Sequence, residues 1–95
     1  MNKKEELLYF LQNHLFDPVL YSPFTSHELK YDFKSMLKMI QNFSAEGILL
    51  YFWTTMANEE VKMIFSHRLH EEGITDYDAI LCQFKNRFTY DWLYS

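Results

Sequence analysis

The feature that most constrains the fold is a run of six large apolar residues at positions 48–53, Ile-Leu-Leu-Tyr-Phe-Trp. In a helix, such a run covers every side, and a helix that is apolar all round is a buried one. Ser44 is a suitable N-cap for this helix, which we expect over about residues 44–57. The other segments show apolar residues on one face only. The sequence therefore predicts an all-α fold: a compact single-domain bundle of four to five short helices around this central apolar helix.

The length and composition predict one folded domain over residues 1–95. The chain has 95 residues, and splitting it would leave two pieces too small to be stable alone. Apolar residues make up 48% of the chain, and there are only two glycines and two prolines, which excludes a disordered or low-complexity protein. The formal net charge of −4 suits a soluble protein and disfavours a general binder of polyanions.

The sequence also predicts a cytoplasmic protein. Cys82 is the only cysteine, so the chain has no internal disulfide and fits a reducing compartment. The N-terminus lacks the apolar core of a signal peptide. The longest apolar run has six residues, far fewer than the roughly 20 that a membrane span needs.

Helix starts are marked by residues that cap a helix N-terminus, in three cases followed three residues later by an acidic residue, as in a capping box. The expected caps are Asn2 (with Glu5), Thr25 (with Glu28), Ser44, Asn58 and Thr75 (with Asp78).

The residue before a proline is pushed out of the α region, so Asp17 and Pro18 are expected to end the first helix. The segment that follows carries Pro23 and is expected to be an irregular connection. Its apolar residues are expected to pack onto the core; they are Val19, Leu20, Tyr21 and Phe24.

Helical spacing of apolar residues predicts the buried faces of the remaining helices. On the fourth helix these residues are Val61, Ile64, Phe65 and Leu69, with Gly73 as its left-handed C-terminal residue. The tail, residues 89–95, fits two patterns. Alternating aromatic residues favour an extended segment, whereas Phe84, Phe88 and Trp92 fit a continuing helix.

The number of aromatic residues is the strongest indication of function. Nine Phe, seven Tyr and two Trp are more than a core of this size can hide. Some of these rings should therefore be exposed, and Tyr, Trp, Phe and Met are enriched at protein interfaces. The candidates that lie off the apolar faces are Tyr9, Tyr31, Met39, Met63, Tyr90, Trp92 and Tyr94.

His67 and His70 lie three residues apart on the fourth helix, with Glu71 beside them. Two such ligands can reach one metal ion, but a closed zinc site needs about two more, and no spacing in the chain recommends them. Because both histidines lie opposite Val61 and Phe65, we expect them on a partner surface, with a small metal-binding protein as an alternative.

Lys30, Lys34 and Lys38 are spaced at i, i+4 and i+8, which places three like charges on one side of a helix. Such a row can hold an acidic partner or a phosphate. It is also typical of an ordinary solvated helix face, here partly balanced by Glu28 and Asp32.

A helical DNA-binding regulator is a second alternative. Its recognition helix would need nearby cations to neutralise phosphates, yet acids outnumber bases by seven to four in the second half of the chain. Nucleic acid is therefore not the expected partner.

No catalytic motif is present. The chain lacks a glycine-rich phosphate loop, a nucleophile elbow and a zinc-protease pattern, and Cys82 is expected on the outer face of its helix. The sequence therefore predicts a non-enzymatic protein-binding module without a cofactor. Its partner would be another protein, and a homodimer is one form that this contact can take.

Overall fold

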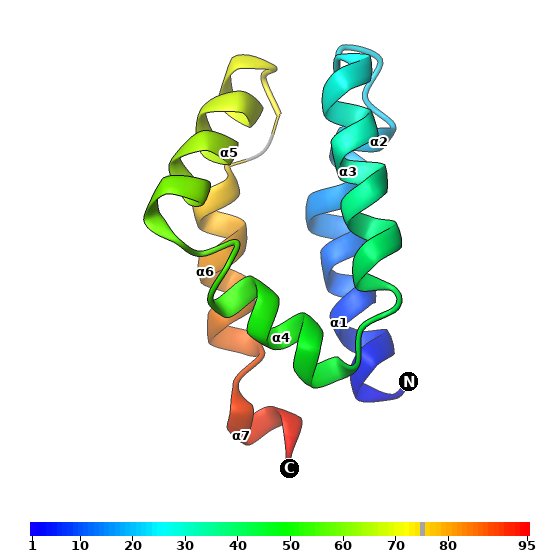
Figure 1. Cartoon of the computed structure of the whole chain (residues 1–95), viewed down its shortest axis with the longest axis vertical. Coiled ribbons are helices and arrows are strands. Elements are labelled where there is room, and N and C mark those ends of the chain that lie inside the picture. The colour runs from blue at the N-terminus through cyan, green and yellow to red at the C-terminus, as the bar shows by residue number, and fades with distance from the viewer. Residues whose placement is uncertain (75) are drawn as a thin grey trace.

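The computed structural model describes residues 1–74 and 76–95, and within them it confirms the all-α prediction. Five α-helices of nine or more residues match the expected number, and two further α-helices have four residues each. In chain order the elements are α1 (Lys3–Leu11), the π-helical turn η1 (Gln12–Phe16), α2 (Asp17–Leu20), α3 (His27–Ile40), α4 (Ala45–Trp53), α5 (Glu59–Glu71), α6 (Tyr77–Arg87) and α7 (Tyr90–Leu93) (Figure 1).

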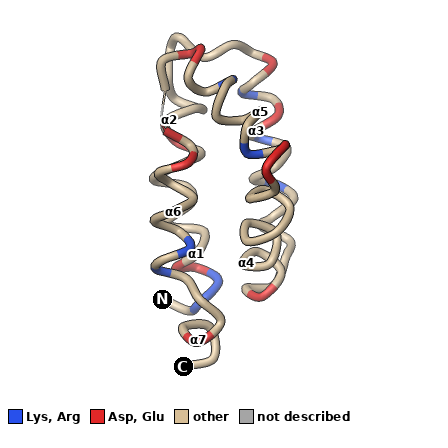
Figure 2. Tube along the Cα trace, turned by 90° about the vertical axis from the view of Figure 1, so that its left-hand side faces the viewer, with Lys and Arg blue, Asp and Glu red and all other residues tan. Residues whose placement is uncertain are grey.

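The helices form two layers (Figure 2). α1, α6 and α7 lie on one side of the molecule, and α3, α4 and α5 lie on the other. In Figure 1, α3 runs beside the segment from α1 to α2, α5 runs beside α6, and α4 crosses between these two pairs. Both termini lie at the same end of the molecule. The apolar faces of the helices meet between the layers.

The core is largely aromatic. Near the α2 end of the bundle, Phe33 of α3 packs edge-on against Phe16 and lies 5.8 Å from Phe65 of α5, measured between ring centroids. Phe65 in turn lies 5.8 Å from Tyr77 of α6. One chain of rings therefore joins four helical segments, although in Figure 1 the ribbons of α3 and α5 stand apart.

A second set of rings fills the other end of the bundle. Phe10 of α1 lies 6.0 Å from Phe84 and 5.4 Å from Phe88. Phe52 of α4 lies 5.5 Å from Phe84, and all of these rings are buried. Edge-to-face and tilted pairs at these distances are the arrangements that aromatic rings favour, and each adds to the free energy gained by burying the rings.

The apolar run that dominates the sequence is only partly enclosed. Ile48, Leu49 and Phe52 are fully buried, and Tyr51 and Trp53 are half-buried. Leu50 is 48% exposed, so the expectation that every side of this helix is covered is wrong there. The reason is that α4 is part of one of the two outer layers (Figure 2) and contacts α1 of the other layer, so it is not surrounded by helices on all sides.

Three of the expected N-caps are confirmed. The side chains of Asn2, Ser44 and Asn58 each accept a hydrogen bond from a backbone N–H in the first turn of the helix that follows. α3 differs by one residue, because Ser26 accepts from the Leu29 N–H while Thr25 is buried.

Asp76 caps α6 by accepting a hydrogen bond from the Ala79 N–H at 3.3 Å. The cap expected at this point, Thr75, lies outside the described residues.

The chain does not leave the helix at Asp17 and Pro18, so the helix end expected there is wrong. Through η1 the helix widens by one residue, and the Asp17 N–H donates to the Gln12 carbonyl five residues earlier. Pro18 then occupies the first turn of α2. In a regular α-helix a proline ring clashes with the carbonyl four residues before it, and a π-helical turn relieves that clash.

The tail is neither extended nor a continuation of α6. Phe88 ends α6 in an extended conformation, with φ −113° and ψ 93°, and its carbonyl accepts a hydrogen bond from the indole Nε1 of Trp53. Thr89 then caps α7 by accepting from the Trp92 N–H. On α7, Trp92 packs on Phe88, and its carbonyl accepts a 2.7 Å hydrogen bond from Lys3 Nζ. These contacts hold the two termini together.

α5 ends as the sequence predicts, at a left-handed glycine. Gly73 has φ +67°, its N–H donates to the His70 carbonyl, and the Ile74 N–H donates to the Leu69 carbonyl. This pair of bonds is a Schellman motif. On the buried side of α5, Leu69 is fully buried and Val61 and Phe65 are half-buried.

The expected burial of Ile64 is wrong. Its side chain is 56% exposed, because it lies on the side of α5 that turns away from Leu69.

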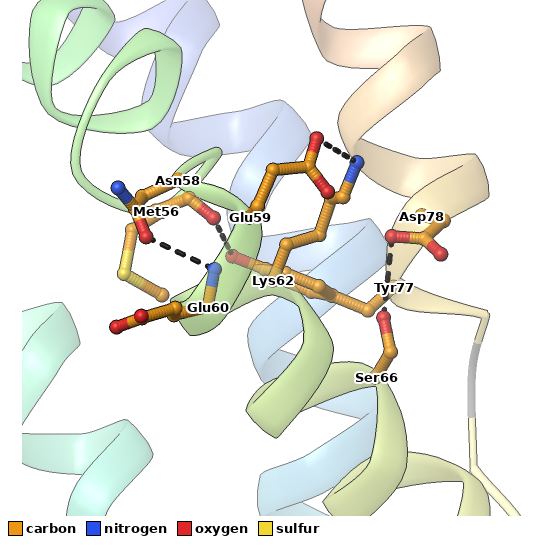
Figure 3. Close-up of polar contacts among 8 residues, drawn as sticks. All are labelled: Met56, Asn58, Glu59, Glu60, Lys62, Ser66, Tyr77 and Asp78. Carbon is orange, nitrogen blue, oxygen red and sulfur yellow. Dashed lines mark hydrogen bonds and ion pairs between the residues drawn. The ribbon is translucent and has the colours of Figure 1, made fainter.

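Tyr77 connects α6 to the loop between α4 and α5 (Figure 3). Its hydroxyl donates a 3.0 Å hydrogen bond to the Met56 carbonyl, and its ring is 1% exposed. Burial raises the pKa of Tyr77, and the neighbouring Tyr51 and Asp78 raise it further. Next to Tyr77 in the chain, the Asp78 carboxylate accepts a hydrogen bond from the Ser66 hydroxyl of α5 (Figure 3). This bond also joins α5 to α6.

We predict that Gly73→Ala lowers the free energy of unfolding by about 1 kcal/mol, measured by chemical denaturation. A Cβ at this position would meet no atom within 4 Å, so the loss comes from the left-handed backbone alone. Gly73→Asn should lose less, because asparagine tolerates this conformation better. Equal losses for the two variants would contradict this account.

We predict that Tyr77→Phe lowers the free energy of unfolding by about 1–2 kcal/mol at neutral pH, because the Met56 carbonyl loses its donor. Above about pH 10, tyrosine ionises in the unfolded chain while buried Tyr77 keeps its proton, so stability falls as the pH rises. Tyr77→Phe should make that alkaline fall less steep. Tyr31→Phe, which removes an exposed hydroxyl, is the control; an equal effect in both variants would contradict the prediction.

Candidate functional site

Most of the side chains expected to contact a partner are exposed. Tyr31 is 72% exposed and Met63 68% exposed. Two of the others are half-buried: Trp92, which packs on Phe88, and Lys30. The exposed members come from four helices; they are Tyr9 on α1, Tyr31 and Met39 on α3, Met63 on α5, and Tyr90 with Tyr94 at α7.

The burial of aromatic residues divides by type. Eight of the nine phenylalanines are buried or half-buried, and each of these eight takes part in a ring pair. Five of the seven tyrosines are exposed. A tyrosine side chain has both an apolar ring and a hydroxyl. It therefore suits a surface that is exposed to water in the free protein and buried in a complex.

The loop between α2 and α3 exposes two rings that were expected in the core. Tyr21 is 80% exposed and Phe24 is 86% exposed, so the expectation that they pack inward is wrong. The loop is anchored on both sides of these rings, because Val19 is fully buried and Thr25 is 7% exposed. Val19 and the half-buried Leu20, which packs against the core, already supply the apolar cover here. We call residues 21–24 the aromatic loop.

A hydrogen bond to Glu72, the C-cap of α5, fixes the end of the aromatic loop. The Ser26 N–H donates to the Glu72 carboxylate at 2.9 Å, which places a negative charge at the N-terminus of α3. This is the favourable end of the helix dipole for an anion. The aromatic loop therefore projects from a fixed base, and Pro23 within it restricts its backbone further.

His67 and His70 are exposed, as expected, and line a shallow pocket of about 450 Å³ between α5 and the start of α6. Met63 and Tyr77 contribute apolar wall to it. His67 Nε2 lies 3.0 Å from a carboxylate oxygen of Glu71, one turn along α5. Over residues 1–74 and 76–95, no three His, Cys, Asp or Glu side chains come together as a metal site would require, so the metal-binding alternative gains no support.

Lys30, Lys34 and Lys38, the lysine row, lie along α3, and Lys34 and Lys38 are exposed. The expected balance by Asp32 is not formed. Asp32 instead lies 3.0 Å from the Arg68 guanidinium of α5, on the other flank of α3. In the described part of the chain, none of the three lysines makes an ion pair.

Cys82 is exposed on α6, as expected, at a second pocket of about 240 Å³. The ionisable neighbours there are Lys62, Lys85, Glu59 and Asp78. A cysteine nucleophile needs a base such as histidine within hydrogen-bond reach, and the residues around this pocket do not include one.

Comparison of the chain with protein families, with curated proteins and with solved structures returned no match. None of the helices in the described residues is both long enough and apolar enough to cross a membrane.

We predict that replacing Tyr21 and Phe24 together by serine changes the free energy of unfolding by less than about 0.5 kcal/mol, because neither ring contributes to the core. Phe33→Ala, which empties a fully buried position, should cost about 3–5 kcal/mol. Chemical denaturation of the two variants checks both values. A large loss in the serine variant would show that the aromatic loop stabilises the fold.

Proposed function

We propose that this chain is a non-enzymatic protein-binding module that acts through its exposed aromatic surface. The observation that supports it best is the division of the rings, with the phenylalanines in the core and the tyrosines on the surface. A chain that needed its rings only for folding would bury them by preference, since each ring removed from water adds favourable free energy.

The candidate contacts fall into three regions. The exposed rings and methionines form the first, the His67 and His70 pocket forms the second, and the lysine row forms the third. The lysine row would select for acidic partners.

The module is proposed to work in the cytoplasm, with another protein or a second copy of the chain as its partner. A lone exposed cysteine suits a reducing compartment. A second copy could cover the same exposed rings, in which case the oligomeric state would change with concentration.

We predict that a variant with Tyr9, Tyr31, Tyr90 and Tyr94 replaced by serine folds normally but loses its partner. Immobilised wild-type protein should retain a specific protein from a lysate, and the variant should retain at least about tenfold less of it. Light scattering on a sizing column separates self-association from binding to another protein.

The matched control replaces four exposed polar residues outside the three candidate regions by serine: Gln12, Gln41, Gln83 and Asp91. It should retain the partner. A strictly monomeric wild-type protein that retains nothing would overturn the proposal. So would equal capture by the wild-type protein and the tyrosine variant.

A further inference from the structure

Most of the cations in this protein take part in its own fold. Of the nine lysines and arginines, six have a partner within the described residues. Lys3 and Lys4 donate to backbone carbonyls, Lys62 and Arg68 pair with carboxylates, and Lys85 and Arg87 lie over aromatic rings. The three for which residues 1–74 and 76–95 supply no hydrogen bond, ion pair or ring are Lys30, Lys34 and Lys38.

The sequence of α3 explains why the lysine row has no partner. A helical side chain meets residues three and four positions away, and none of these positions around the three lysines holds an acid. The two acids of α3, Glu28 and Asp32, lie on its other flank, and Asp32 is held by Arg68. The like charges repel one another mildly, so the row does not stabilise the helix.

The row has a regular geometry. Successive lysines are four residues apart, which is a rise of about 6 Å along the helix axis, so the row extends over about 12 Å. Tyr31, 72% exposed, lies three positions before Lys34 and therefore on the same side of α3. α3 forms an edge of the bundle, away from α6 (Figure 1). The outer face of α3 therefore presents Lys34 and Lys38, both exposed, beside the exposed Tyr31 ring, with half-buried Lys30 at the start of the row.

We propose that this face of α3, the lysine row with Tyr31, is the docking surface for an acidic segment of a partner protein. Carboxylates spaced about 6 Å apart, as on one face of a helix, would each meet one lysine. The Tyr31 ring would supply an apolar contact at the Lys30 end of the row. This inference rests on the proposed function and adds the chemistry of the partner.

Charge and burial favour a short acidic segment over a larger polyanion. The whole chain carries a net charge of −4, so its remaining surface would be repelled by a nucleic acid or an anionic membrane that extends beyond the row. Charges act over about 8–10 Å at moderate salt, which confines the attraction to the row itself. A membrane would also need an apolar helix face, and that face of α3 is buried, with Leu29, Phe33 and Ile40 fully enclosed.

The test uses a short fluorescent alanine-rich helical peptide with glutamate at every fourth position, and the same peptide with glutamine. Fluorescence anisotropy with the full chain should show that the glutamate peptide binds, that the glutamine peptide does not, and that added salt weakens binding. The K34Q/K38Q variant should lose about tenfold in affinity. The matched control, K62Q/K85Q, removes the same charge elsewhere and should stay within about twofold of the wild-type protein.

Failure of the glutamate peptide to bind would overturn the inference, and so would equal losses of affinity in the two lysine variants. A third contrary result would be that a single-stranded oligonucleotide or phosphatidylserine vesicles bind more tightly than the peptide and that K34Q/K38Q abolishes this binding. Failure here is distinct from failure of the proposed function. If K34Q/K38Q still captured the cellular partner while the tyrosine variant did not, the proposed protein-binding function would be supported. The inference that an acidic segment binds the lysine row would then be wrong.

Discussion

The fold depends on phenylalanine rings that contact one another across the two helical layers. Phe33 of α3 packs against rings from two other segments, Phe16 and Phe65, and α3 and α5 are also joined by the ion pair of Asp32 with Arg68. Flat rings of this size cover a wide gap with few residues, and tilted pairs pack without forcing the backbones together. That explains how α3 and α5, whose ribbons stand apart in Figure 1, still enclose a buried core. The polar contacts lie at the margins of these rings and fix the orientation of the helices.

Much of the helical pattern could be predicted from the sequence, because caps and amphipathic spacing are local signals. Asn2, Ser44, Asn58 and Gly73 act as their residue types suggest, each through a bond within a few positions along the chain. The failure at Pro18 has a different origin. The rule that a proline ends a helix applies to a regular α-helix. The extra residue of η1 changes which backbone carbonyl lies near the Pro18 ring. Apolar spacing does not indicate where a π-helical turn will form.

The errors of burial are errors of tertiary structure. Leu50, Ile64 and Phe24 are apolar, and nothing in their neighbours distinguishes them from Leu49, Phe65 and Val19, which are buried or half-buried. The difference is which sides of α4, α5 and the aromatic loop face the core, and apolar spacing along the chain does not show this. Four of the five exposed tyrosines were predicted, because they lie off the apolar stripes; Tyr21 is the exception. Trp92 lies off those stripes too, but the break at Phe88 turns it back onto the core.

The candidate contacts and the fold use different residues, and this separation is itself informative. Lys3 joins α1 to Trp92, and Arg87 of α6 lies over the rings of Phe10 and Phe88. Neither could serve a partner without giving up these contacts. Lys34, Lys38, Tyr31 and Phe24 are under no such constraint, because their side chains lie outside the core. A like-charged row and an exposed phenylalanine both carry small penalties in the isolated chain, from repulsion and from unfavourable hydration. A partner that supplies carboxylates and apolar cover would remove both penalties, so binding would be favoured by the same features that the fold leaves unused.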